Sequence, residues 1–190
     1  IQKMVKKTIE RFGKIDILVN NAAILGRVKI TRGVPFNDLS LEEWSRVMTV
    51  NVTGVFLCCQ AVFPYMKNQG KGKIINISSG QFYTGGGHVR YPHYVASKGA
   101  VIGLTRALAW ELGEYGININ CISPGSTLTE DPGDQAAVEI RKAAIPKRSL
   151  KRIEYPEDVV GTAIFLASSD SDFITGQNIM VNGGAIGEMI

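Results

Sequence analysis

The stretch YPHYVASK, residues 91 to 98, places a tyrosine and a lysine four positions apart at the expected start of a helix. Tyr94 and Lys98 would then share one helical face, one turn apart. Free tyrosine has a pKa of about 10 and is a poor base at neutral pH, but an ammonium group within about 4–6 Å lowers that value. The spacing therefore favours a phenol that exchanges a proton with a substrate hydroxyl or carbonyl. An ordinary surface pair on a helix would give the same spacing.

Side chains from two other segments extend this candidate site. Ser78 and Ser79 follow the apolar stretch KIINI, and a hydroxyl there can donate a hydrogen bond to a carbonyl oxygen that gains charge. Two serines at such a place are also typical of a loop cap. Asn51 lies inside a long expected helix, where asparagine is a mediocre helix former. Its side chain would either bond nearby backbone or hold a water molecule next to Lys98.

Apolar periodicity predicts helices that alternate with short buried strands. Ser40 and Glu43 form a capping-box pattern that opens the longest stretch of helical spacing. Segments rich in glycine, proline and polar residues, at 26–39, 80–87 and 124–133, predict loops. The expected helices cover residues 1–12, about 40–67, 94–113, 134–144 and 156–168, and the expected strands cover residues 15–23, 73–79, 117–122 and 177–184.

This alternation indicates an α/β fold. Continuous apolar strands separated by helices predict a parallel sheet that is covered on both faces. We expect one domain over residues 1–190, because no internal repeat or linker interrupts the pattern. Functional groups of such sheets gather beyond the carboxyl ends of the strands. Three of the strands end in NNAA, SSG and SPG, so these segments should meet beside Tyr94.

Composition narrows the functional classes. The 190 residues are 45% hydrophobic and 20% charged, with a net charge of +4 and scattered basic residues, which does not favour nucleic-acid binding. No uninterrupted apolar run is long enough to span a bilayer, and no histidine or cysteine spacing suggests a metal site. Three cysteines in apolar segments indicate reduced thiols, so we expect a cytoplasmic protein.

Several motifs in one order carry a family resemblance. The segments DILVNNAA, VNVTGVF, GKIINISS, YVASK, SPG and VNGG occur in this succession from about residue 1 to the end. Together they resemble the short-chain dehydrogenase/reductase family, of the kind called classical. The resemblance implies a Rossmann-like doubly wound parallel sheet, and a matched series of motifs is far more specific than any one of them.

The resemblance also implies a catalytic tetrad. Tyr94 matches the family's acid/base, and Lys98 matches the residue that lowers the tyrosine pKa and binds the nicotinamide ribose. Asn51 matches the asparagine that holds a water molecule in the proton relay. Ser79, rather than Ser78, matches the serine that orients the substrate, although the interval from Ser79 to Tyr94 is slightly longer than usual in the family.

Contacts to NAD or NADP are implied in the same way. They involve two turns, one after the strand at 15–23 and one after the strand at 117–122. The first matches the family's Asn-Asn-Ala-Gly turn, with alanine in place of the usual glycine, and the second matches the turn under the nicotinamide and the positions that contact its carboxamide. The residues concerned are Asn20, Ala22 and Ala23 in the first turn and Pro124, Gly125, Thr127 and Thr129 in the second, besides Tyr94 and Lys98.

The glycine-rich phosphate-binding turn of the family is not found ahead of DILVNNAA, where the sequence has only a helix. The family would place two or more βα units there, on the order of 60 residues. We therefore expect a chain that lacks the amino-terminal strands, with the strand at 15–23 exposed as an edge. The residue that distinguishes NAD from NADP would lie in that part.

Two functions follow from these expectations. The first is an NAD(P)-dependent oxidoreductase that interconverts an alcohol with a ketone or aldehyde, acting on a small molecule as a homo-oligomer, a dimer or a tetramer. The second is a non-catalytic fragment that retains only the oligomerisation surface, built from the helices at 40–67 and 94–113. Phe82, Tyr83 and Tyr91, in the segment before Tyr94, suggest an apolar or ring-containing substrate, although aromatic residues there can equally be packing.

Overall fold

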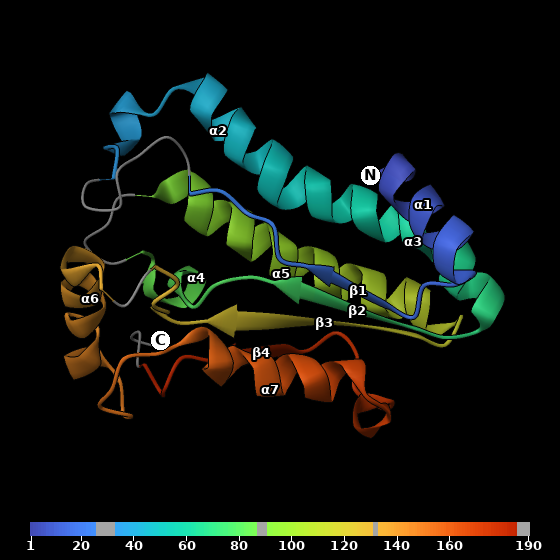
Figure 1. Cartoon of the computed structure of the whole chain (residues 1–190). Helices are drawn as coiled ribbons and strands as arrows, with labels where there is room; N and C mark the ends of the chain where they lie inside the picture. The colour runs from blue at the N-terminus through green and yellow to red at the C-terminus, as the bar shows by residue number, and fades with distance from the viewer. Residues whose placement is uncertain (26–32, 87–90, 131–132, 186–190) are drawn as a thin grey trace.

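The computed structural model describes residues 1–25, 33–86, 91–130 and 133–185. A parallel sheet of four strands runs through this part of the chain, in the order β1-β2-β3-β4 (Figure 1). The parallel pairing of β1 with β2, β2 with β3 and β3 with β4 confirms the expected α/β sheet. The strands are β1 (Ile17–Asn20), β2 (Gly72–Ile77), β3 (Ile117–Pro124) and β4 (Asn178–Val181).

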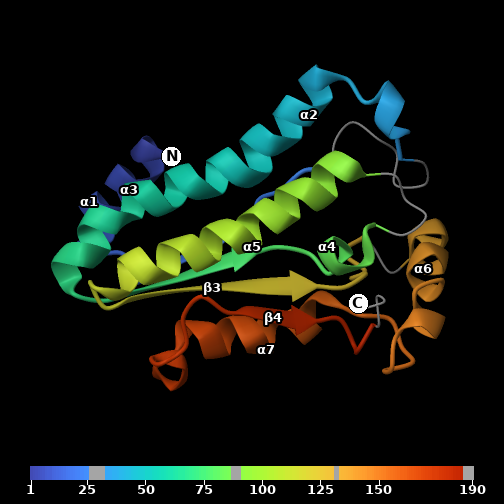
Figure 2. The same ribbon diagram turned by 180° about the vertical axis from the view of Figure 1, so that it is seen from behind.

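Helices lie on both faces of the sheet, which confirms the doubly wound, Rossmann-like arrangement (Figures 1 and 2). One face carries α1, α3 and α5, and the opposite face carries α7. The helix α6 lies near the carboxyl ends of the strands. The bounds are α1 (Gln2–Phe12), α2 (Leu41–Met48), α3 (Gly54–Gln69), α5 (Pro92–Gly113), α6 (Gln135–Lys142) and α7 (Pro156–Ala167).

Alternation of side chains along β2 and β3 produces two apolar layers. Successive residues of a strand point to opposite faces of the sheet. Ile74 and Ile119 therefore belong to the core under α3 and α5, whereas Ile75 and Ile122 pack with Leu166 of α7. Because both faces of the two central strands are buried, their sequences read as nearly continuous apolar runs.

The helix expected from residue 40 to about 67 forms, but it is not a regular α-helix throughout. Ser40 Oγ accepts a hydrogen bond from Glu43 N at 3.2 Å, which gives the expected start. Between α2 and α3 the chain forms the π-helical turn η2 (Thr49–Thr53), and α3 ends at Gly70 in a left-handed conformation. Asn51 lies inside the π-turn, a local widening that is often found at functional sites.

The combined helix Leu41–Gln69, of 29 residues, is long and apolar enough to cross a membrane by length and composition. The expectation concerned uninterrupted apolar runs, and this helix begins with the charged residues Glu42, Glu43 and Arg46. One such helix is weak evidence, since core helices of water-soluble proteins meet the same test. Here Val55, Val62 and Met66 of this helix belong to the buried core.

Other differences from the predicted elements are local. The expected loop at 80–87 contains a short helix, α4 (Gln81–Thr84), and α5 begins at Pro92, two residues earlier than expected. The first turn of a helix tolerates proline, because its missing N–H has no partner there in any case. Part of the loop expected at 26–39, residues 26–32, lies outside the described residues. Short 3₁₀ segments are η1 (Phe36–Asp38), η3 (Ile145–Lys147) and η4 (Ser169–Ser171).

Within the described residues, β1 forms one edge of the sheet. It pairs with β2 on one side only, and the side chains of Ile17 and Val19 are 45% and 49% exposed. The expectation of an exposed edge at this strand is therefore met in the part of the chain that the structure describes.

The turn between α5 and β3 requires glycine at position 116. Gly116 has a φ of +69°, and a Cβ at this residue would lie 2.3 Å from the carbonyl oxygen of Gly70. We predict that Gly116→Ala lowers the free energy of unfolding by at least about 2 kcal/mol, from left-handed strain and the steric clash together. Denaturant unfolding of the complete protein measures the change.

Gly161→Ala is the matched control. Gly161 lies within α7, and no heavy atom would lie within 4 Å of its added Cβ. Alanine there should leave stability unchanged or raise it by about 0.5–1 kcal/mol, because glycine is a poor helix former. Equal effects of the two substitutions would contradict the described turn.

Candidate active site

Tyr94 and Lys98 lie in the first turns of α5, beside the carboxyl end of β2. The Tyr94 phenol is hydrogen-bonded to the side chain of Ser79. Lys98 Nζ donates to the carbonyl oxygen of Ile77 at 2.8 Å and lies 5.6 Å from the centre of the Tyr94 ring. The structure thus brings the predicted tyrosine, lysine and serine together at one edge of the sheet.

The two serines after β2 have different partners. Ser78 Oγ donates to the main-chain oxygen of Lys98 at 2.8 Å, and Ser78 is buried. It therefore fastens the end of β2 to α5. Ser79, by contrast, contacts the phenol of Tyr94, and its Oγ accepts a hydrogen bond from Gln81 N at 3.2 Å. Of the pair, Ser79 is the one whose hydroxyl reaches the candidate acid/base.

Burial determines the electrostatics of this site. The pKa of Tyr94 is raised from its ordinary value because the phenol is desolvated, and the hydrogen bond to Ser79 opposes this only in part. The pKa of Lys98 is lowered to about 8, again mainly by burial, against a smaller opposing interaction with Cys121. The net shift of the Tyr94 pKa in the protein alone is therefore upward, because desolvation of the phenol is its largest cause. The part that Lys98 and a nicotinamide would take in lowering this pKa stays a prediction.

The side chain of Asn51 bonds main chain of one segment and a serine of another. Its Oδ1 accepts from Ile24 N at 2.8 Å, and its Nδ2 donates to Ile24 O at 2.9 Å and to Ser97 Oγ at 3.0 Å. Ser97 Oγ donates in turn to Tyr94 O at 2.7 Å. Both amide hydrogens are used within the protein, and the water expected next to Lys98 stays a prediction. The side chain ties the segment after β1 to the start of α5.

Asn20 belongs to a buried polar network across the sheet. Its Nδ2 donates to Asn76 Oδ1 on β2 at 2.8 Å and lies 3.5 Å from Cys59 Sγ on α3. Asn76 Nδ2 donates to Thr105 Oγ1 on α5 at 2.9 Å. Asn20 therefore holds the end of β1 against its neighbours. The next residues of the predicted turn, including Ala22 and Ala23, are exposed.

The second predicted cofactor turn follows β3. Gly80 N donates to Pro124 O at 2.8 Å, and Gly125 N donates to Val181 O at 3.0 Å, so this turn lies between the segment after β2 and the end of β4. Thr127 Oγ1 donates to Glu154 at 2.8 Å, which leaves the main chain of Thr127 for other contacts. The fourth residue of this set, Thr129, is exposed and donates through its main-chain nitrogen to Glu130 at 3.0 Å.

Glu154 was not predicted from the sequence. It is 4% exposed, and its carboxylate accepts hydrogen bonds from Gly125 N and Thr127 Oγ1. The only signal was a single acidic residue between Ile153 and the proline that opens α7, a pattern that is equally typical of a helix start. Its partners lie 27 and 29 residues away in the sequence, so local reasoning did not find it.

The aromatic residues before Tyr94 are used mainly in packing. Tyr83 OH accepts a hydrogen bond from Asn178 Nδ2 of β4 at 2.8 Å, and its ring packs edge-on against Phe82 at 5.1 Å. Phe82 also lies against Gly99, where an added Cβ would come 2.6 Å from the ring. Tyr91 is 4% exposed. These contacts favour the packing alternative for Phe82 and Tyr83.

The side chains present fit the nicotinamide end of a dinucleotide. An ammonium group has three hydrogens to donate. The buried Lys98 uses one of them on Ile77 O, its only hydrogen-bond acceptor in the described residues. The hydrogens that remain suit the hydroxyls of a ribose beside Tyr94. No group of three or more His, Cys, Asp or Glu within the described ranges is placed to hold a metal ion.

A parallel doubly wound sheet with a Tyr, Lys and Ser site at its carboxyl edge defines a Rossmann-type oxidoreductase of the short-chain class. A family model described as enoyl-(acyl carrier protein) reductase matches residues 1–185. This chain belongs to the short-chain dehydrogenase/reductase family.

Known relatives agree with that assignment. The chain is 39% identical to (2S)-[(R)-hydroxy(phenyl)methyl]succinyl-CoA dehydrogenase subunit BbsD of Thauera aromatica, over 97% of this chain and 70% of that protein. It is 42% identical to 2-dehydro-3-deoxy-D-gluconate 5-dehydrogenase of Dickeya dadantii, over 95% of this chain and 69% of that protein. The solved structure of the TT0495 protein from Thermus thermophilus has a TM-score of 0.81 at 34% identity, covering 96% of this chain and 74% of that one.

Burial of the Lys98 charge predicts a gain in stability when the charge is removed. The pKa falls from 10.5 to about 8 on folding, so the unfolded chain binds more protons between these two values. The charge therefore costs stability below pH 8, and the cost disappears as the pH rises to 10.5. We predict that Lys98→Met raises the free energy of unfolding at pH 7 by up to about 3 kcal/mol.

Comparing Lys98→Met with the unsubstituted protein at each pH cancels the raised pKa of Cys59, which both proteins share. Since the Lys98 charge lowers the pKa of Cys121, the comparison is made below the Cys121 pKa of about 11, where that thiol is protonated in both proteins. The gain should shrink between pH 8 and 10.5 in denaturant titrations. A loss of stability at pH 7 would show that the ammonium group is held more favourably than its burial implies.

Proposed function

We propose that this chain carries the catalytic part of an NAD(P)-dependent oxidoreductase that interconverts a secondary alcohol and a ketone, or an alcohol and an aldehyde, on a small molecule. The observation that supports this most strongly is the surroundings of the Tyr94 phenol. The phenol is hydrogen-bonded to Ser79, and the centre of its ring lies 5.6 Å from Lys98 Nζ. The names of the relatives from Thauera aromatica and Dickeya dadantii are both those of dehydrogenases, the first of a hydroxyl compound, which supports the same chemistry.

In the reductive direction, Tyr94 donates its proton to the carbonyl oxygen of the substrate. The raised pKa keeps the phenol protonated at neutral pH and therefore ready to act as an acid. Ser79 donates a hydrogen bond to the same oxygen as negative charge develops on it. In the oxidative direction the ionised phenol accepts the alcohol proton.

The nicotinamide of NAD or NADP would supply the hydride and, when oxidised, a positive charge. Lys98 would bind its ribose with the hydrogens that Ile77 leaves free. Pro124, Gly125 and the main chain of Thr127 would border the ring, and the exposed Ala22 and Ala23 would lie along the cofactor. Lys98 thus has two roles, binding the cofactor and placing a cation beside the phenol.

We also propose that the protein works as a homo-oligomer in a reducing compartment such as the cytoplasm. Large apolar side chains on the outer faces of α2, α3 and α5 support an interface with a second copy. The three cysteines are free thiols, which is compatible with a reducing compartment. The exposed side chains are Trp44, Phe56, Leu57, Tyr65 and Trp110, with Trp110 87% exposed.

The acid/base role of Tyr94 is tested with the complete protein. Tyr94→Phe removes only the hydroxyl, so turnover should fall by about 10³-fold or more while the Kd for the cofactor changes by less than about threefold. Steady-state kinetics and cofactor fluorescence titration measure the two quantities separately. Turnover near that of the unsubstituted enzyme would end the assignment.

The pH dependence of alcohol oxidation tests the electrostatics. Since the phenol must be ionised to accept a proton and its pKa is raised by burial, the oxidation rate should rise with pH and level off above the phenol pKa. The Ser79 hydrogen bond lowers that pKa. Ser79→Ala should therefore move the midpoint of the residual activity to higher pH.

Ser78→Ala is the matched control for this shift. Ser78 bonds the main chain of Lys98 and not the phenol, so its removal should leave the midpoint of the pH profile in place even if the rate changes. Identical midpoints in the unsubstituted enzyme and both variants would contradict the Ser79 contact.

A further inference from the structure

Glu154 fastens the turn after β3 through several contacts. Its Oε1 accepts hydrogen bonds from Gly125 N at 3.0 Å and from Thr127 Oγ1 at 2.8 Å. Its main-chain oxygen accepts from Leu128 N at 2.8 Å, and Thr127 pairs with Glu154 as an isolated parallel bridge. Glu154, a single residue, therefore holds three positions of a turn that lies 26 to 29 residues earlier in the sequence.

A buried cation balances the carboxylate. Arg148 is 3% exposed, and its Nη1 lies 3.8 Å from Glu154 Oε2. The same guanidinium donates to Ser126 O at 3.4 Å and to Arg152 O at 3.3 Å. The buried pair thus contacts Gly125, Ser126 and Thr127. Removing one partner of such a pair leaves the other charge uncompensated, so the two side chains act together.

Steric contacts limit the turn from the same side. A Cβ on Gly125 would lie 2.5 Å from Glu154 Oε2 and 2.9 Å from Asn182 Cβ, so only glycine allows this close approach. Gly125 N also donates to Val181 O. The turn is therefore pressed against β4 and Glu154 and has no room to shift in that direction.

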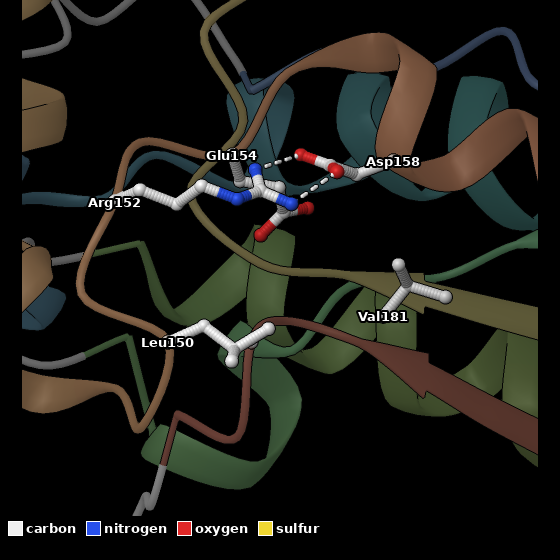
Figure 3. A pocket seen from close by; sticks show the side chains of 6 residues that line it. Leu150, Arg152, Glu154, Asp158 and Val181 are labelled. Carbon is white, nitrogen blue, oxygen red and sulfur yellow. Dashed lines mark hydrogen bonds and ion pairs between the residues drawn. The ribbon is translucent and has the colours of Figure 1, made fainter.

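Figure 3 shows the surroundings of Glu154. Its side chain lies with Leu150, Arg152, Asp158 and Val181 around a pocket of about 190 Å³. Arg152 donates two hydrogen bonds of 2.6 Å to Asp158. The Glu154 carboxylate instead accepts hydrogen bonds from the turn after β3. Two carboxylates thus line one pocket, but only Glu154 contacts the turn after β3.

We propose that Glu154 is a positioning residue, which sets the place of the turn 124–127 and thereby of the nicotinamide; this inference rests on the proposed function. Hydrogen bonds from an N–H or O–H to a charged acceptor are stronger than those to a neutral one, so the carboxylate holds Gly125 and Thr127 more firmly than an amide would. Its bond to Thr127 also keeps that hydroxyl away from the ligand. The turn then presents main-chain groups in a fixed geometry.

The test uses Glu154→Gln in the complete protein, with the nicotinamide cofactor that supports turnover. The glutamine keeps the shape and removes the charge. We expect the KM for the cofactor to rise about tenfold while kcat changes by less than about threefold. Inhibition by ADP-ribose, or by its 2′-phosphate for an NADP enzyme, should be unchanged, because that molecule lacks the nicotinamide. A merely structural role would weaken the binding of both.

Asp158→Asn is the matched control. It neutralises the other carboxylate of the same pocket, which pairs with Arg152 and accepts from Tyr155 N but does not contact the turn. Its KM for the cofactor should stay within about twofold of the unsubstituted value. A rise equal to that of Glu154→Gln would overturn the proposal, as would a Glu154→Gln enzyme with an unchanged KM or with a parallel loss of ADP-ribose affinity.

Thr127→Val provides a second measurement if Glu154→Gln does not fold. It removes one donor to Glu154 and leaves the buried ion pair, so we expect a cofactor KM raised about threefold with ADP-ribose inhibition unchanged. No rise would overturn the positioning role. Failure of the proposed function would give a different result: the unsubstituted protein would bind neither NADH nor NADPH in fluorescence titration.

Discussion

The burial of one ammonium group constrains the whole candidate site. Lys98 is 3% exposed, and in the described residues only Ile77 O accepts a hydrogen bond from it. Desolvation of a charge is costly unless the group is held and paired, and the lowered pKa of about 8 reflects this cost. The lysine nevertheless remains mostly protonated at pH 7. The neighbouring elements must therefore hold α5 against β2 firmly enough to keep a cation in place.

Three polar ties provide that rigidity, and each joins segments that are distant in the sequence. Ser78 binds the main chain of Lys98, Asn51 joins Ile24 to Ser97, and Asn20 begins the network that reaches α5 through β2. Buried polar groups are expensive unless every hydrogen bond is made, so these ties specify a single arrangement of the strand ends. The same principle accounts for the turn after β3, where Glu154 is the anchor.

The sequence predicted the elements well and their chemistry less well. The parallel sheet, its two covered faces and the meeting of the end of β2 with Tyr94 and Lys98 follow from periodicity and from the order of the strands. The choice of Ser79 over Ser78 came from the family resemblance. The π-turn around Asn51 and the partners of Glu154 do not, because they depend on contacts between residues 27 or more positions apart. The upward shift of the Tyr94 pKa in the protein alone was not predicted, for a related reason. Spacing on a helix gives the position of a cation, but only the packed structure gives the extent of desolvation.

The two shifted groups of the site titrate in an order with mechanistic consequences. Burial lowers the pKa of Lys98 to about 8 and raises that of Tyr94 above its ordinary value. As the pH rises, the chain by itself therefore loses the lysine proton before the phenol proton, and a phenolate beside an ammonium is a minor state. Tyr94 can donate a proton to a carbonyl without any change in this order of proton loss, because the phenol is protonated at neutral pH. Acceptance of a proton near pH 7 needs a further positive charge at the phenol, which an oxidised nicotinamide would carry in the proposed reaction. In the proposed function, proton donation by Tyr94 is therefore compatible with the charges of the protein alone, whereas proton acceptance near pH 7 would draw on the charge that the cofactor brings.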